Sequence, residues 1–291
     1  MVKSLFGAVL LFVSIAIADG SAFAQSKVLN AQFTGIPIAV DGVAESAWDK
    51  AAPSHIGIAM NPRLTATAPE CTTNGDVRAL WDGSLLYLLI SVTDSDVTTA
   101  SSSAMNKDGV EVYIDLWNDK ISKYEEDDGM MRISAPTASL SGSGSQNSIF
   151  PAVYVSRLKA YASAVRVNEQ GAQIGYNVEL AFNIGGVPRK NGSSIGIEFA
   201  INDADSSTNT RKFRIYWNNG NNKGTDDNSI WGTVTLSGYD GKAPMALDTF
   251  LLSQNIAKAD ALVRGIWKSE AGLDRAVAVT VSGAGGIGPY S

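Results

Sequence analysis

The stretch Val110-Glu111-Val112-Tyr113-Ile114-Asp115-Leu116 alternates aliphatic side chains with glutamate, tyrosine and aspartate. Neighbouring side chains of an extended chain point to opposite faces, so this alternation predicts a β-strand with one apolar face. Glu111 then points away from the apolar side of its strand. Asp108-Gly109 precedes the stretch and is typical of a tight turn, because glycine tolerates positive φ.

Similar runs rich in β-branched, leucine and aromatic residues recur along the chain between turn-forming residues. They are Val77–Trp81, Leu85–Val92, Met130–Ser134, Tyr161–Val167, Tyr176–Phe182, Ser194–Ile201, Phe213–Trp217 and Ile230–Leu236. Strands at this density, with no helical periodicity between them, predict an all-β fold. We expect an antiparallel, two-sheet β-sandwich of the immunoglobulin or jelly-roll kind over residues 30–238. Glu45–Ala51 predicts one short helical turn, and the low-complexity segment Ser139–Ser148 predicts a surface loop.

The two ends of the chain depart from the strand pattern. Lys3, the apolar run Leu5–Ile17 and Ala22-Phe23-Ala24 follow one another in the order of a secretory signal peptide. The run is shorter than the roughly 20 residues that cross a bilayer, so we expect cleavage after Ala24 and a secreted or periplasmic product. Apolar residues recur at helical spacing near the other end, which predicts a short helical tail of unknown role over residues 239–291.

The composition excludes several classes of site. The chain has 291 residues with 23 Lys+Arg against 29 Asp+Glu, a net charge of −6, and only one Cys and one His. One cysteine permits no internal disulfide and no Cys-rich zinc site, and one histidine excludes a site with two imidazoles. The acidic balance argues against nucleic-acid binding, which depends on basic side chains. No segment after the first is apolar for long enough to span a membrane.

The densest group of charges is Glu125-Glu126-Asp127-Asp128, which follows Asp115 and Asp119 closely in the sequence. Such a run is either a solvated loop or a site for a hard cation. Calcium prefers six to eight oxygen ligands and tolerates irregular loops, and an exported domain without disulfides gains stability from such an ion. The candidate ligands for a structural calcium ion are Asp94, Asp96, Asp127 and Asp128.

Several motifs occur in an order and spacing that resemble one family. They are Val40-Asp41-Gly42, Val77–Asp82, Val92-Thr93-Asp94, Asp108–Asp115, Tyr124–Asp128, Ile201-Asn202-Asp203 and Trp231–Leu236. Over about residues 35–237 the chain resembles the family 9 carbohydrate-binding modules, β-sandwiches often attached to xylanases. The resemblance implies a calcium-stabilised sandwich that holds sugar chain ends through a carboxylate and an arginine, between two stacked tryptophans.

Carried over position by position, the resemblance places the carboxylate at Glu111, the arginine at Arg132 and a polar contact at Asn222. Met105 and Thr225 stand where the family has its two tryptophans. If the clamp is replaced rather than lost, nearby rings such as Trp217 or Tyr124 are the candidates to supply it.

Three functions follow from these observations. The leading hypothesis is a non-catalytic, exported module that binds β-glucan or xylan chains or their oligosaccharides, with a possible catalytic partner protein. The first alternative is an electron-transfer domain in which Met105, with His55 as a possible partner, binds haem b. The second is a glycoside hydrolase, whole or in part, that depends on Glu111.

Overall fold

The computed structural model describes residues 26–61, 63–122, 124–125, 127–141, 157–185, 189–219 and 227–241. The predicted signal peptide, the tail beyond residue 241 and the candidates Asn222 and Thr225 lie outside these residues. Among the described residues, no helix is long and apolar enough to cross a membrane.

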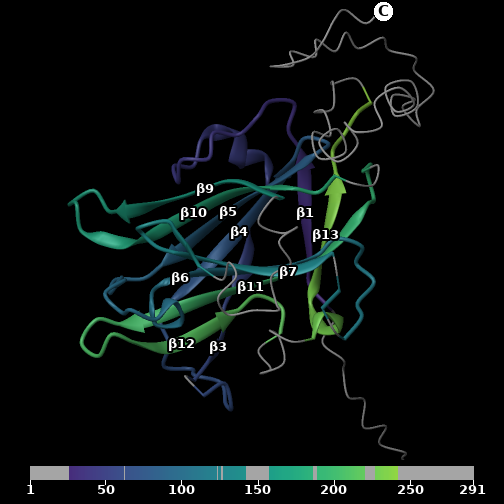
Figure 1. The fold of residues 1–291 in the computed structure, drawn as a ribbon. Coiled ribbons are helices and arrows are strands. Elements are labelled where there is room, and N and C mark those ends of the chain that lie inside the picture. The colour runs from purple at the N-terminus through teal and green to yellow at the C-terminus, as the bar shows by residue number, and fades with distance from the viewer. Residues whose placement is uncertain are drawn as a thin grey trace, which may run out of the picture.

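The described strands form a β-sandwich whose two layers are joined along one side (Figure 1). The front layer contains β8 (Ser139–Ser141), β7 (Asp128–Ser134), β6 (Gly109–Asp115), β11 (Ser194–Asp205), β12 (Thr210–Tyr216) and β3 (Ile58–Met60). The back layer contains β9 (Leu158–Val167), β10 (Gln173–Asn183), β5 (Leu85–Thr93), β4 (Asn74–Trp81) and β2 (Ser54–Ile56). Two further strands, β13 (Gly232–Ser237) and β1 (Val28–Phe33), connect the layers. The all-β sandwich is confirmed.

The pairing corrects the expectation of a wholly antiparallel fold. The first strand, β1, runs parallel to both β13 and β4, whereas the other described pairs are antiparallel. Parallel partners come from distant parts of the chain, so a local pattern does not reveal them. Ser139–Ser141 also departs from prediction, because it pairs with β7 instead of forming a loop. The predicted helical turn is the 3-10 helix η1 (Ser46–Lys50).

The alternation in β6 decides what each face of the front layer carries. Val110, Val112 and Ile114 point into the main core with the inner faces of β4, β5, β10 and β11. Burying each such side chain fully contributes about 1.5–3 kcal/mol to folding. Glu111 and Tyr113 consequently lie on the outer face of the front layer, as the sequence predicts.

The outer face of the back layer is closed by the chain itself. Trp48 of η1 packs on this face and donates its indole N–H to Glu179 Oε1 at 2.8 Å. The other carboxylate oxygen of Glu179 accepts the backbone N–H groups of Asp41 and Gly42 at 3.0 and 2.8 Å. The outer face of the back layer is therefore a second core in which the Glu179 carboxylate has its hydrogen bonds. The polar side chains considered next lie on the front layer and at its junction with β5.

Candidate functional site

The strand register brings a row of polar side chains onto the outer face of the front layer. Glu111 of β6 stands directly opposite Arg132 of β7 and Ala200 of β11. On β12, Arg214 stands opposite Asn202 of β11. Ala200 has only a methyl group, which leaves Arg214 room to reach over it to Glu111.

Every oxygen of the Glu111 carboxylate is occupied. Oε1 accepts hydrogen bonds from Arg132 Nε at 2.7 Å and from Asn202 Nδ2 at 2.8 Å, and Arg132 Nη2 lies 2.6 Å from it. Oε2 accepts from Arg214 Nη2 and from the hydroxyl of Tyr113. We call Glu111, Tyr113, Arg132, Asn202 and Arg214 the polar network.

The polar network keeps Glu111 ionised. Burial alone would raise the pKa of Glu111, but the adjacent Arg214 and Arg132 guanidinium groups and the hydrogen bonds from Asn202 and Tyr113 lower it far below its usual range. All five network members are less than a tenth exposed. The network thus holds a charged carboxylate and charged donors in fixed positions on the outer face of the front layer.

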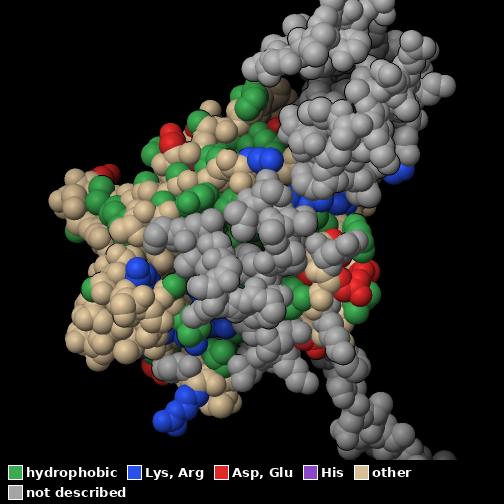
Figure 2. Space-filling model, viewed as in Figure 1, with side chains coloured by type: hydrophobic (Ala, Val, Ile, Leu, Met, Phe, Trp, Pro, Cys, Tyr) green, Lys and Arg blue, Asp and Glu red, His purple; other side chains and the backbone are tan. Residues whose placement is uncertain are grey.

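Two neighbours extend the polar network toward solvent. Asn202 accepts a hydrogen bond through Oδ1 from Arg211 Nη1 at 3.2 Å, and Arg211 is only half-buried. The backbone N–H of Arg211 donates to Asn106 Oδ1 at 3.3 Å. Asn106 belongs to the 3-10 helix η2 (Ala104–Asn106), which also carries Met105, 43 % exposed. Figure 2 shows Lys and Arg side chains next to hydrophobic ones in the region of β11 and β12.

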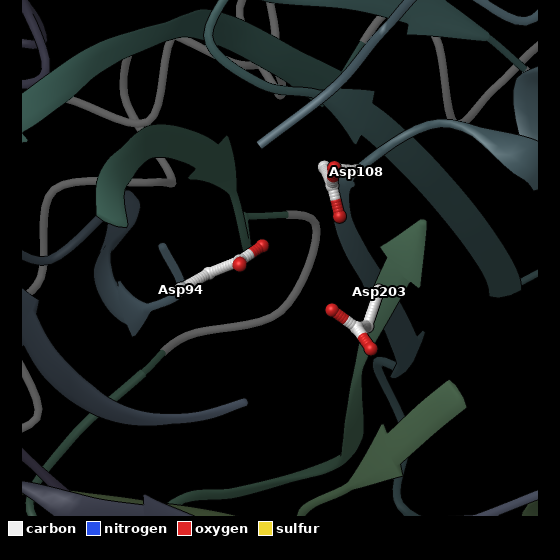
Figure 3. A group of neighbouring side chains, drawn as sticks. All are labelled: Asp94, Asp108 and Asp203. Carbon is white, nitrogen blue, oxygen red and sulfur yellow. The ribbon is translucent and has the colours of Figure 1, made fainter. Parts of the chain in front are cut away.

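A group of three aspartates lies where β5, β6 and β11 come together (Figure 3). Asp94 directly follows β5, Asp108 directly precedes β6, and Asp203 lies near the end of β11. One oxygen of each lies within 4.8 Å of the others, and the three side chains point toward a common centre. We call these three residues the aspartate cluster. Gly109 follows Asp108 with φ of 156°, and a Cβ there would lie 2.3 Å from the Ile133 carbonyl oxygen, so the close approach requires glycine.

The aspartate cluster fits a hard cation. Burial raises the pKa of Asp108 to about 8 and that of Asp203 to about 6, and burial also raises the pKa of Asp94. The second oxygen of Asp94, Oδ2, is buried without a hydrogen-bond partner. Three buried carboxylates, one of them with an oxygen that lacks a hydrogen-bond partner, offer the type of ligand that hard cations such as calcium take.

A second group contains Asp115, Asp127 and Asp128. Its carboxylates also accept hydrogen bonds: both oxygens of Asp128 accept from Asn228 Nδ2 at 2.9 Å, Asp127 Oδ2 accepts the backbone N–H of Trp117 at 2.8 Å, and Asp115 accepts the backbone N–H of Asn118. The structure therefore divides the four predicted metal ligands. Asp94 joins the aspartate cluster and the pair Asp127–Asp128 joins the second group.

Asp96, the fourth predicted ligand, lies outside the acidic groups formed by the described residues. Its Oδ2 accepts the backbone N–H of Ser206 at 3.1 Å instead. His55 lies on β2, exposed and 3.3 Å from Asp76 Oδ1 on β4, whereas Met105 lies on η2, which packs on β11 and β12. The haem alternative gains no support from this arrangement.

A match to a protein-family model decides the family. The model described as "Carbohydrate family 9 binding domain-like" matches residues 40–239, more than half of the chain. The chain belongs to this family. Resemblance and structure thus agree on a family 9 carbohydrate-binding module, and a carbohydrate-binding role follows.

Relatives in sequence come from large enzymes. Exoglucanase XynX of Acetivibrio thermocellus is 31 % identical over 206 residues, which cover 70 % of this chain and 17 % of the relative. Endo-1,4-beta-xylanase A of Thermoanaerobacterium saccharolyticum is 28 % identical over 214 residues, which cover 74 % of this chain and 16 % of the relative. The chain thus spans less than a fifth of the length of these relatives.

Solved structures share the fold. A family 9 carbohydrate-binding module from Caldicellulosiruptor kristjanssonii, in complex with cellotriose, superposes with a TM-score of 0.60 at 22 % identity. The match covers 76 % of this chain and 99 % of that one. A putative carbohydrate-binding protein from Bacteroides uniformis gives a TM-score of 0.51 at 11 % identity, covering 73 % of this chain and 100 % of the other.

The two aromatic residues predicted to replace the family's tryptophans, Trp217 and Tyr124, differ in where they lie. Trp217 is fully buried, packs against Phe199 at 5.4 Å between ring centroids and donates to Ser54 Oγ at 2.8 Å. A ring in the core has no face to offer a sugar, so Trp217 is not the platform. Tyr124 is half-buried and packs on Trp231, which in turn packs on Tyr113 of the polar network. Tyr124 therefore lies nearer the outer face than Trp217 does.

Sequence reasoning missed two arginines of this site, Arg211 and Arg214. A usable signal existed, because Phe213 and Ile215 alternate with Arg214 and Tyr216 in the same way as the stretch in β6. The alternation puts Arg214 on the face opposite the core. The aspartate cluster was missed in part: Asp108 and Asp203 were both in motifs of the family resemblance but not among the candidate ligands.

Proposed function

We propose that this chain is an exported, non-catalytic module that recognises the ends of β-glucan or xylan chains during polysaccharide degradation. The observation that carries the proposal is the Glu111–Arg132 pair, fixed across two strands on the outer face of the front layer. A guanidinium donates hydrogen bonds to the oxygens of sugar hydroxyl groups, and Glu111, whose own oxygens accept from the network, holds Arg132 in place for that role. A pair held 2.6 Å apart by its own sheet pays little ordering entropy when a sugar binds.

Calcium is the cofactor that we propose. Asp94, Asp108 and Asp203 would hold the ion, which would neutralise three buried carboxylates and tie the ends of β5, β6 and β11 together. The polar network is built on β6 and β11 too, through Glu111 and Asn202. Calcium would therefore stabilise the frame that holds the sugar-binding groups without touching the sugar.

The cellular setting is part of the same proposal. The order of basic, apolar and small residues in positions 1–24 supports export with cleavage after Ala24. Relatives in which a similar segment is a small part of a long enzyme support action beside a catalytic partner. Mass spectrometry of the exported protein tests the first point, since the mature chain should begin at Gln25.

Binding measurements test the central claim. Calorimetric titration of the calcium-loaded protein with cellotriose and xylotriose, and affinity gels with β-glucan and xylan, should show binding to at least one of them. Arg132→Met should weaken that binding, whereas Lys50→Gln, on η1 over the back layer, should leave it unchanged. A folded, calcium-loaded protein that binds none of these ligands would contradict the proposal. Release of reducing sugar from the polysaccharides would contradict its non-catalytic part.

A further inference from the structure

The charges of the polar network do not balance. Among the described residues that bond to one another here, Glu111 carries one negative charge, while Arg132, Arg214 and Arg211 carry three positive charges. The next carboxylate along this face of β11, Glu198, accepts backbone N–H groups at its end of the sheet and lies beside Lys27 and Lys120. It therefore does not offset the surplus.

Buried guanidinium groups without counter-charges are costly. Arg214 has Glu111 as its counter-charge, which Glu111 shares with Arg132, and the Nε of this 3 % exposed side chain has no hydrogen-bond partner. The hydroxyl of the fully buried Tyr216 also has none, and Arg214 lies over this ring at 4.9 Å. Arg211 contacts Asn202 but pairs with no carboxylate among the described residues. Burial, followed by the nearby Arg214 charge, lowers the pKa of Arg211 by more than the more weakly acting Glu111 raises it.

The arginine N–H groups without a partner indicate which chemical group a ligand would bring to this face. An arginine fork matches a carboxylate in two parallel hydrogen bonds, and among the described residues Arg211 donates from its side chain only to Asn202. The two positions at which the family resemblance expects rings carry Met105 and Thr225, so affinity from ring stacking is reduced. An ion pair between a charged sugar and an arginine is another way to supply the affinity that ring stacking would give.

We propose that this face binds a sugar carrying a carboxylate, a uronic acid, with Arg211 as the carboxylate-recognising residue. Arg211 is half-buried, so the ligand meets its guanidinium group first and completes the charge balance of the network behind it. The inference rests on the proposed carbohydrate-binding function and narrows it to acidic saccharides, such as xylan chains with uronic acid substituents.

Ligands that differ only in charge separate carbohydrate binding as such from recognition of the carboxylate. D-Glucose, D-glucuronate and the uncharged D-glucuronamide share one ring shape and differ in charge, and calorimetry in a carboxylate-free buffer compares them. A charged pairing of this kind predicts that glucuronate binds at least about tenfold more tightly than either neutral sugar. The preference should shrink as salt is raised from low to high concentration, because the carboxylate reaches a half-exposed guanidinium.

Variants locate the effect. Arg211→Gln should abolish the preference for glucuronate, and Arg211→Lys should restore it in part, because the charge returns without the fork. Lys50→Gln removes the same charge from the opposite side of the sandwich and should change nothing. Circular dichroism and thermal unfolding confirm that each variant is folded.

The outcomes are distinct. Equal or tighter binding of glucose overturns the uronic acid inference and leaves the carbohydrate-binding proposal standing. Tighter binding of glucose 6-sulfate than of glucuronate overturns the carboxylate assignment. Absence of binding to all of these ligands, together with cellotriose and xylotriose, overturns both proposals.

Discussion

The polar network and the aspartate cluster are built on the same two strands and have opposite charge imbalances. On β11, the adjacent residues Asp203 and Asn202 serve the cluster and the network. At β6, Asp108 directly precedes the strand and serves the cluster, while Glu111 within the strand serves the network. Alternation along an extended chain sends residues an odd number of positions apart to opposite faces, so each strand supplies both sites. The network and its neighbour Arg211 have one carboxylate among three guanidinium groups, whereas the cluster has three carboxylates and one buried oxygen without a hydrogen-bond partner.

This contrast indicates what each region lacks. The network holds its carboxylate ionised and has positive charge to spare, so it is set to receive an anion. The cluster shifts its carboxylates toward the protonated form, so it is set to receive a cation. Each region is incomplete in a way that one ligand would correct, and the following experiments test the two halves of the contrast in order of expected effect.

The largest effect is expected from Glu111→Gln. It removes the negative charge that faces Arg132 and Arg214, both less than a tenth exposed. Breaking a buried pair in this way costs about 3–5 kcal/mol of unfolding free energy. Urea unfolding measures the loss, and Glu169→Gln in an exposed turn is the control, expected to change stability by less than about 0.5 kcal/mol. A loss equal to that of the control would show that the guanidinium groups do not depend on Glu111.

The second-largest effect is expected from calcium binding, which should stabilise the folded state. At a hundredfold excess over its Kd, a bound ion stabilises the folded state by about 2.7 kcal/mol, which corresponds to a rise in Tm of roughly 5–10 °C in a domain of this size. Scanning calorimetry with calcium and with a chelator measures the rise. Asp108→Asn should abolish most of it, and Asp49→Asn on η1 should retain it. An equal calcium response in the Asp108 variant would assign the ion to another place.

The pH dependence of the calcium-free protein should show a smaller effect. The folded-state pKa of Asp108 is raised to about 8 and that of Asp203 to about 6, each by burial, above values near 4 in the unfolded chain. The folded state therefore binds more protons than the unfolded state between those values, and stability falls as the pH rises from about 4 to about 8. Each of these groups that is protonated only in the folded state lowers the stability by about 1.4 kcal/mol for every pH unit of increase.

Other buried carboxylates also lower the stability as the pH rises. The informative quantity is therefore the difference in stability between the calcium-loaded and the calcium-free protein. Burial also raises the pKa of Glu198 to about 8 and that of Asp128 to about 6. Calcium holds the cluster ionised and should remove only the part due to Asp94, Asp108 and Asp203. Unfolding curves at pH 5 and pH 8, with calcium and with chelator, should therefore diverge at the higher pH. Parallel curves would rule out titration of the cluster as the cause.

The same contrast explains how much the sequence could predict. Alternation over 110–116 was enough to predict a strand and the outward direction of Glu111, because side-chain direction in a strand is a local property. Charge density, also local, directed attention to Asp127 and Asp128, which belong to the second acidic group and not to the aspartate cluster. Asp108 and Asp203 are far apart in the sequence, and only the pairing of β6 with β11 brings them together.

Register also explains the missed arginines. Arg214 reaches Glu111 across Ala200, and neither the pairing of β12 with β11 nor the small size of the intervening side chain is visible in a single segment. The parallel partners of β1 escaped prediction for the same reason. Local patterns therefore predicted the elements and their faces, whereas the content of both sites depended on contacts between distant strands.

The smallest expected effect concerns Met105, at the edge of the polar network. Its side chain is 43 % exposed, so Met105→Ala should change the unfolding free energy by less than about 0.5 kcal/mol. Met105→Trp would place an indole where the family resemblance expects one, next to Asn106 and therefore next to Arg211. Stacking of a ring on an aromatic side chain is worth about 1–3 kcal/mol, so binding of cellotriose should strengthen by about tenfold or more. Calorimetry measures the change, with Ile121→Trp as an exposed control.

Stacking acts on neutral and charged sugars alike, so the gain should be similar for glucuronate and for glucose. If the tryptophan instead favoured glucose alone, the carboxylate and the ring would be competing for one ligand orientation, and the network would hold acidic sugars in a pose of its own.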